Sequence, residues 1–190
     1  MQIFVLTNRK KRMDKIAIFC SASDEIDPVY FEKARELGVW MGQNKKTLIY
    51  GGANVGLMEC VARAAKENGC PTVLGVVPTK LEQRGRVSDV LDVTFRTDNL
   101  SDRKEVMLNE ADVLVALPGG VGTLDEVFTV MAAATLDYHR KQVIFYNIDG
   151  FWDDILHFLD SLETRHFAHQ PLNRFYAVAN DWNELTELLK

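Results

Sequence analysis

The chain has 190 residues, 47% of them hydrophobic and 26% charged, and a formal net charge of −5. This length suits one domain with a sizeable core, and the acidic balance predicts neither a nucleic-acid partner nor an anionic membrane surface. No apolar run reaches the length of a membrane helix. The three cysteines lack a Cys-x-x-Cys spacing, so we expect no zinc site, no disulfide framework and a cytoplasmic location.

Short apolar segments alternate with longer segments of helical period along most of the chain. Residues 1–12 are expected to form a loosely ordered extension, and residues 13–190 a single domain. Strands are predicted at residues 16–20, 47–50, 72–77, 92–95, 112–117 and 142–146. Helices are predicted at residues 28–43, 55–68, 101–110, 123–136 and 151–162, with a last helix from residue 181. The polar stretch at residues 79–89 shows no clear period.

This alternation predicts an α/β fold, a doubly wound, Rossmann-like parallel sheet with helices on both faces. The continuous apolar run at residues 112–117 is typical of a strand buried on both faces. In such sheets ligands bind beyond the carboxyl ends of the strands. We therefore expect the loops at residues 21–27, 51–56 and 118–123 to converge on one crevice.

The loop at residues 118–123 has the composition of a phosphate site. Gly119, Gly120 and Gly122 stand between the buried strand and a helix, where glycine lets the backbone approach a ligand closely. The start of the helix offers unpaired N–H groups and the positive end of its dipole. Val121 lies within this loop, and Thr123 could add a hydroxyl donor.

Glu126 has two interpretations from spacing alone. Thr123 and Glu126 have the spacing of a capping box, in which the glutamate satisfies a backbone donor at the helix start. Alternatively, Glu126 is a catalytic carboxylate behind the phosphate loop. Capping by itself does not call for three glycines and a proline just before the helix, which favours a ligand loop.

A second glycine-rich loop follows the predicted strand at residues 47–50. Gly51 and Gly52 lead into a helix, and Asn54 either contacts a ligand or caps that helix. Two glycine-rich helix starts at one sheet edge suit a ligand with both a phosphate and a sugar.

Arg103 and Lys104 open the helix before the buried strand, where a cation opposes the helix dipole. This placement is mildly unfavourable without an anionic partner. Either an anion binds there, or the pair is solvated and neutralised locally by Asp98, Asp102 and Glu105.

These residues resemble the motifs of a known family. Residues 118–126, Pro-Gly-Gly-Val-Gly-Thr-Leu-Asp-Glu, resemble the PGGxGTxxE signature of the LOG family, the cytokinin riboside 5′-monophosphate phosphoribohydrolases often mislabelled lysine decarboxylases. Arg103-Lys104, followed by Met107, resembles the second element of that family, and residues 51–58 resemble its GGGxxGLM loop. The resemblance runs from about residue 15 to residue 150.

The resemblance implies a Rossmann-like fold, a homodimer or larger homo-oligomer, and no cofactor. It implies hydrolysis of the N-glycosidic bond of AMP-type nucleoside 5′-monophosphates, including N6-substituted ones, to free base and ribose 5-phosphate. Glu126 and Arg103 would be the catalytic pair. The substrate and its phosphate would be contacted by Gly119, Gly120, Val121, Gly122, Thr123, Lys104, Gly51, Gly52, Asn54 and Ser21.

Three departures from the family pattern concern the base that is recognised. The turn at Ser21 replaces a CGSS-like turn, and Ala53 and Glu59 replace glycines of the second loop. Gly85 stands where the family has a glutamate that contacts substrate, and Glu82 could take its place.

Other hypotheses are weaker. Molybdenum-cofactor carriers have a similar fold and glycine loop and bind without cleaving, but the intact Arg103 and Glu126 favour hydrolysis. A nicotinamide-dependent oxidoreductase would need Gly-x-Gly-x-x-Gly after the first strand, which is absent. Lys80 and Lys104 give no convincing Schiff-base context. His166 and His169 could form a metal site at i and i+3, but a helix end is the better interpretation.

Overall fold

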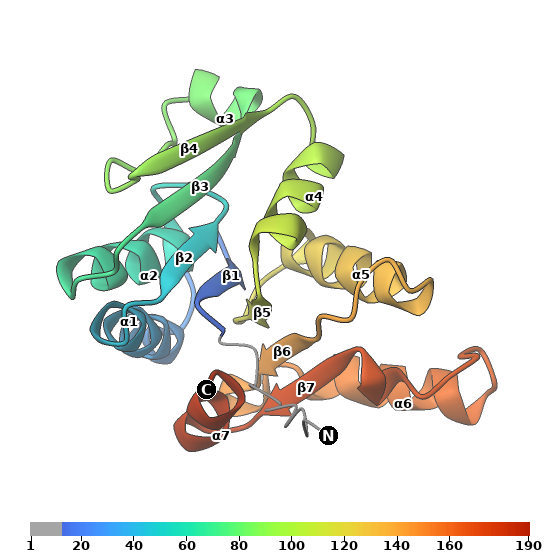
Figure 1. The fold of residues 1–190 in the computed structure, drawn as a ribbon. Coiled ribbons are helices and arrows are strands. Elements are labelled where there is room, and N and C mark those ends of the chain that lie inside the picture. The colour runs from blue at the N-terminus through green and yellow to red at the C-terminus, as the bar shows by residue number, and fades with distance from the viewer. Residues whose placement is uncertain (1–12) are drawn as a thin grey trace, which may run out of the picture.

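The computed structural model describes residues 13–190, so the predicted extension at residues 1–12 lies outside the described residues. Within that range the strands form one seven-stranded sheet in the order β4-β3-β2-β1-β5-β6-β7, and every neighbouring pair is parallel (Figure 1). The strands are β1 (Lys15–Phe19), β2 (Thr47–Tyr50), β3 (Val73–Pro78), β4 (Val93–Thr97), β5 (Val113–Ala116), β6 (Val143–Tyr146) and β7 (Tyr176–Ala179).

Helices cover both faces of the sheet, as the alternation of elements predicts (Figure 1). The helices are α1 (Pro28–Gln43), α2 (Gly56–Glu67), α3 (Thr79–Gln83), α4 (Leu100–Glu110), α5 (Val121–Thr135), α6 (Asp153–Thr164) and α7 (Trp182–Leu188), with short 3₁₀ turns η1 (Ile148–Gly150) and η2 (Leu172–Arg174). One core cluster packs α1, α2 and α7 on one face, and the other packs α4, α5 and α6 on the opposite face. The predicted doubly wound α/β fold is confirmed.

Several elements differ from the sequence prediction, among them α6, which begins at Asp153 instead of residue 151. β7 was not predicted, and the polar stretch contains the short helix α3. α5 begins at Val121, two residues before the predicted start, because Gly120 is already its N-cap residue. Among residues 13–190 no helix combines the length and apolar character needed to cross a membrane.

The strand order reverses between β1 and β5, since β2, β3 and β4 lie on one side of β1 and β5, β6 and β7 lie on the other. β1 pairs with β2 on one side and with β5 on the other, so the loops after β1 and β5 lie next to each other. The Ser21 amide donates to the Pro118 carbonyl at 3.0 Å, and the Ser21 carbonyl accepts from the Leu57 amide at 3.0 Å. The three loops therefore lie next to one another at the switch point, where ligands bind in this architecture, but only the first two contribute to the lining of one cavity.

Candidate functional site

The glycine loop after β5 ends in an open helix start. Gly120 is the N-cap of α5 and has no side chain to cap it, and a Cβ added at Gly120 or Gly122 would meet no atom within 4 Å. Gly119 differs, because its Cβ would lie 2.1 Å from the Thr123 hydroxyl oxygen. The loop therefore leaves its first-turn amides without a side-chain acceptor, the arrangement that favours an anion.

The capping-box interpretation of Glu126 is wrong. Both Thr123 and Glu126 lie inside α5, not at its boundary, and both side chains are buried. Thr123 packs against Gly119, while Glu126 accepts a hydrogen bond from Arg103. The threonine and the glutamate therefore make different contacts, and neither contact is that of a capping box, although the spacing is the same.

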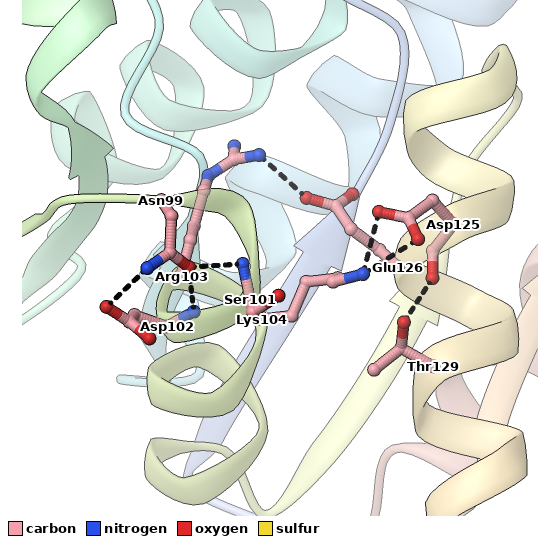
Figure 2. A network of polar contacts seen from close by, with 8 residues as sticks. All are labelled: Asn99, Ser101, Asp102, Arg103, Lys104, Asp125, Glu126 and Thr129. Carbon is pink, nitrogen blue, oxygen red and sulfur yellow. Dashed lines mark hydrogen bonds and ion pairs between the residues drawn. The ribbon is translucent and has the colours of Figure 1, made fainter.

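Arg103 and Glu126 form a buried ion pair between α4 and α5 (Figure 2). Arg103 Nη1 lies 3.0 Å from Glu126 Oε1, and the two side chains are 13% and 7% exposed. Arg103 Nε also donates to the Val76 carbonyl at 3.1 Å, at the end of β3. This second bond fixes the guanidinium, so Arg103 holds the carboxylate in a single orientation.

The environment of Glu126 brings its titration near neutral pH. Burial raises the pKa of Glu126 to about 7, although the Arg103 charge opposes this rise. The neighbouring Asp125 raises the pKa further, and Lys104 lowers it. A carboxyl group whose pKa lies near neutrality can exchange protons during a reaction, and such groups are concentrated at functional sites.

Lys104 forms a second ion pair beside the first. Its Nζ lies 2.7 Å and 2.9 Å from the two carboxylate oxygens of Asp125 (Figure 2). Local neutralisation by Asp98, Asp102 and Glu105 was therefore the wrong prediction for these cations, whose acidic partners come from α5. Asp102 instead accepts from the Asn99 side chain, which caps α4.

The second glycine loop packs directly against the Arg103 side chain. A Cβ at Gly51 would lie only 1.9 Å from Arg103 Nη2, so only glycine leaves room for the guanidinium. Gly52 has a φ of +73°, a conformation that L residues rarely adopt. Asn54 does not cap α2, since Val55 is the N-cap residue.

Replacing Gly51 with alanine should lower the free energy of unfolding by about 1–3 kcal/mol, because the added methyl overlaps the guanidinium. The measurement is denaturant unfolding. Gly122→Ala is the matched control: its added methyl meets open space, so it should be neutral or slightly stabilising. Equal effects of the two substitutions would contradict the close packing of Gly51 on Arg103.

A cavity of about 590 Å³ opens beside this pair, and Arg103 belongs to its lining. Its apolar wall includes Ala22 of the first loop, Ala53 and Val55 of the second, and Met58 of α2. The glycine loop and Glu126 lie outside the lining, so Arg103 is the residue that joins the cavity to the carboxylate.

A cluster of cations on this cavity was missed by the sequence analysis. Lys80, Arg84 and Arg86 come from α3 and the turn after it, and all three line the cavity. The available signal was three cations within seven residues of a polar stretch, directly after a predicted strand.

Comparisons with known proteins identify the family of this chain. A family model described as "Possible lysine decarboxylase" matches residues 58–189. Cytokinin riboside 5′-monophosphate phosphoribohydrolase LOG7 of Arabidopsis thaliana is 35% identical over 181 residues, covering 95% of this chain and 83% of that protein. The probable phosphoribohydrolase LOGL9 of Oryza sativa subsp. japonica is 34% identical, with 95% and 79% covered. The chain belongs to the LOG family.

Solved structures share the fold of this LOG-family chain. The molybdenum cofactor carrier protein of Chlamydomonas reinhardtii superposes with a TM-score of 0.71 at 25% identity, covering 94% of this chain and 96% of that one. The molybdenum cofactor binding protein of Rippkaea orientalis gives a TM-score of 0.70 at 24% identity with the same coverage, which shows the fold alone.

The departures from the LOG pattern have structural explanations. Gly85 has a φ of +64° and ends α3, with its amide donating to the Glu82 carbonyl at 2.9 Å. The Glu82 carboxylate forms an ion pair with Arg96, with Arg96 Nη2 3.0 Å from Glu82 Oε1. Glu82 is also absent from the lining of the cavity, so it does not replace the family glutamate there. Glu59 pairs with Arg63 at 2.6 Å on α2.

Two remaining candidates, the Ser21 hydroxyl and His166, have local explanations. The Ser21 hydroxyl accepts from the Ser23 amide at 3.1 Å, within its own loop. His166 follows the end of α6 in a left-handed conformation, with a φ of +61°, as a helix end requires. Within residues 13–190 no group of three or more His, Cys, Asp or Glu side chains could hold a metal.

Proposed function

We propose that this chain hydrolyses the N-glycosidic bond of AMP-type nucleoside 5′-monophosphates, including N6-substituted ones, to free base and ribose 5-phosphate. The observation that carries the proposal is the buried pair of Arg103 and Glu126 beside an open glycine loop. The names of the curated relatives, cytokinin riboside 5′-monophosphate phosphoribohydrolases, support the same bond and the same phosphate.

The 5′-phosphate would bind at the start of α5. Gly120 and Gly122 leave the approach open, and the first-turn amides with the helix dipole supply the attraction. The buried Thr123 side chain packs on Gly119, so we assign the donors to the backbone and not to this hydroxyl. Binding the phosphate fixes the ribose, so that binding energy away from the reacting bond positions the anomeric carbon.

The ribose would lie against Glu126. Departure of the base leaves an oxocarbenium-like positive charge on the sugar, which an ionised carboxylate stabilises. The same carboxylate can take a proton from the attacking water, since its pKa is about 7. Arg103 acts by holding the carboxylate, through its bonds to Glu126 and to the Val76 carbonyl.

The base would enter the cavity next to Arg103. Ala22, Ala53, Val55 and Met58 provide an apolar wall of the kind that accepts a planar ring. With the phosphate at α5 and the base in the cavity, the bond to be cut lies near Arg103 and Glu126.

We further propose a homodimer or larger assembly in the cytoplasm. Val121, Phe128 and Leu136 leave apolar surface exposed along and just beyond α5, a face that suits a subunit interface. All three cysteines of the chain are free thiols, in keeping with a reducing compartment.

The test is a substrate panel scored for ribose 5-phosphate. AMP and N6-substituted AMP analogues should each release base and ribose 5-phosphate, and adenosine should react at least about 100-fold more slowly in kcat/KM because it lacks the phosphate. Adenosine controls for binding of the base alone. If no nucleoside monophosphate in the panel releases ribose 5-phosphate, the proposed function is wrong.

A second candidate is a carrier that binds a phosphorylated ligand without cleaving it. It is favoured by the likeness in fold to the carrier protein of Chlamydomonas reinhardtii, at a TM-score of 0.71. Tight binding of molybdenum cofactor together with no turnover in the panel would select the carrier.

A further inference from the structure

The cavity beside Arg103 is lined by three cations in addition to the arginine that pairs with Glu126. Lys80, Arg84 and Arg86 line it, and Asp98 is the one carboxylate in its lining. Within residues 13–190 these three cations make no ion pair, whereas Arg96 on the adjacent strand pairs with Glu82. The chain as a whole has a net charge of −5, so this concentration of cations does not reflect composition.

The backbone holds the cation-bearing turn against the second glycine loop. The Arg86 carbonyl accepts from the Asn54 amide at 3.1 Å, and the Ser88 amide donates to the Gly52 carbonyl at 2.9 Å. Ala53 and Val87 form an antiparallel bridge between these two bonds. The base of the Arg86 side chain is therefore fixed over the loop that supports Arg103.

Arg84 is placed by the end of α3. The Arg86 amide donates to the Leu81 carbonyl at 3.3 Å, and Gly85 takes the left-handed conformation that this tight turn needs. The turn brings Arg84 and Arg86 to the same cavity although they are two residues apart. Both side chains are exposed, so the guanidinium groups are accessible to a ligand in the cavity.

The lining therefore combines apolar side chains with cationic ones. Ala53, Val55 and Met58 suit an aromatic ring, but a neutral base offers no partner to the cations. Guanidinium groups bind carboxylates through paired, charge-assisted hydrogen bonds. We infer that the cavity selects nucleoside 5′-monophosphates whose base bears an anionic, carboxylate-containing substituent, with Arg84 and Arg86 as the specificity residues.

This inference rests on the proposed function for the bond that is cut, but the recognition itself is a separate property. The competing explanation is electrostatic steering, in which the cations attract the 5′-phosphate of every substrate. Steering depends on the net charge of the ligand, so it also favours the dicarboxylate, but it acts on the association rate, whereas direct contacts slow dissociation. The two explanations therefore predict different rate constants behind the same substrate preference.

The experiment compares N6-(1,2-dicarboxyethyl)-AMP with its dimethyl ester, which has the same skeleton without the two charges. Initial rates of ribose 5-phosphate release give kcat/KM for the full-length wild type, for the double variant Arg84→Gln/Arg86→Gln, and for Arg165→Gln. Arg165 is an exposed arginine after α6, outside the lining of the cavity, and serves as the control for removing a surface arginine. Affinities and association and dissociation rates of both compounds are measured on Glu126→Gln, and on Glu126→Gln carrying the double substitution, as a readout that needs no turnover.

The dicarboxylate should exceed its ester by about tenfold or more in kcat/KM and in affinity, from at least one charge-assisted contact. The double variant should lose this preference, while Arg165→Gln keeps it. A preference that lies in the association rate alone would show steering and overturn the inference, and so would a fall of equal size for both compounds in the double variant. Hydrolysis of both compounds without preference would overturn the inference alone, whereas a binding preference without hydrolysis would support it and remove only the proposed function.

Discussion

Glu126→Gln should lower kcat for ribose 5-phosphate release by about 10²–10⁴-fold, the size of effect expected when a positioned acid–base group is lost. Glutamine keeps the shape of the side chain and can still accept from Arg103, but it supplies neither negative charge for the oxocarbenium ion nor a base for water. The measurement is single-turnover release of ribose 5-phosphate from AMP.

The pH dependence identifies the group responsible. The active form of Glu126 is the carboxylate and its pKa is about 7, so wild-type kcat/KM should rise with pH through that value and level off above it. Asp125→Asn is the matched control for removing one carboxylate. It should retain most activity and move this rise to lower pH, because the Asp125 charge raises the pKa of Glu126. Hydrolysis by Glu126→Gln at the wild-type rate would show that the catalytic assignment is wrong.

Measurements of unfolding free energy show whether Glu126→Gln loses catalytic activity alone or loses folding stability as well. The folded-state pKa of Glu126 lies above its ordinary value of 4.5, so the native protein binds this proton more tightly than the unfolded chain does. That stabilisation is fully present below about pH 4.5 and is lost as pH rises through about 7. At about 1.36 kcal/mol per pKa unit the contribution is about 3 kcal/mol, and Glu126→Gln should lack this pH-dependent loss.

Local patterns were sufficient to predict the frame of the fold. The apolar run that becomes β5 is buried along its whole length, and α1 spans the predicted residues 28–43, with Pro28 in its first turn. Both signals lie within one element, so neither needs knowledge of distant partners. The convergence of three loops also followed, because parallel strands present their carboxyl ends at one edge.

Features that depend on distant contacts were not predictable. β7 has only four residues, and its identity as a strand comes from its pairing with β6. Lys104 has acidic residues close by in sequence, yet its partner is Asp125 on another helix, 21 positions away. Likewise, Arg86 lies at the cavity because its backbone bonds to Asn54, which no spacing rule indicates. The site residues are local motifs, but their partners are set by packing.

Replacing Arg103 tests whether the ion pair or the carboxylate alone defines the site. Arg103→Gln leaves Glu126 buried without its counter-charge, so the pKa of Glu126 should rise above 7 and the rise in kcat/KM should move to higher pH. At pH 8 the variant should lose about 3–5 kcal/mol of unfolding free energy, as expected for breaking a buried pair by removing one partner. At pH 5.5 the loss should be smaller, since Glu126 is then protonated and needs no counter-charge.

Arg103→Lys separates charge from geometry. A lysine restores the positive charge but cannot bond to the Val76 carbonyl and Glu126 with a rigid, planar group. We therefore expect recovery of most of the stability at pH 8 but an activity still about 100-fold below wild type, because the carboxylate is no longer held in one orientation. Lys104→Gln, which breaks the more exposed pair with Asp125, should cost less than about 1 kcal/mol and serves as the control. If the loss in Arg103→Gln is the same at pH 5.5 and pH 8, the arginine stabilises the protein by packing alone and does not compensate the Glu126 charge.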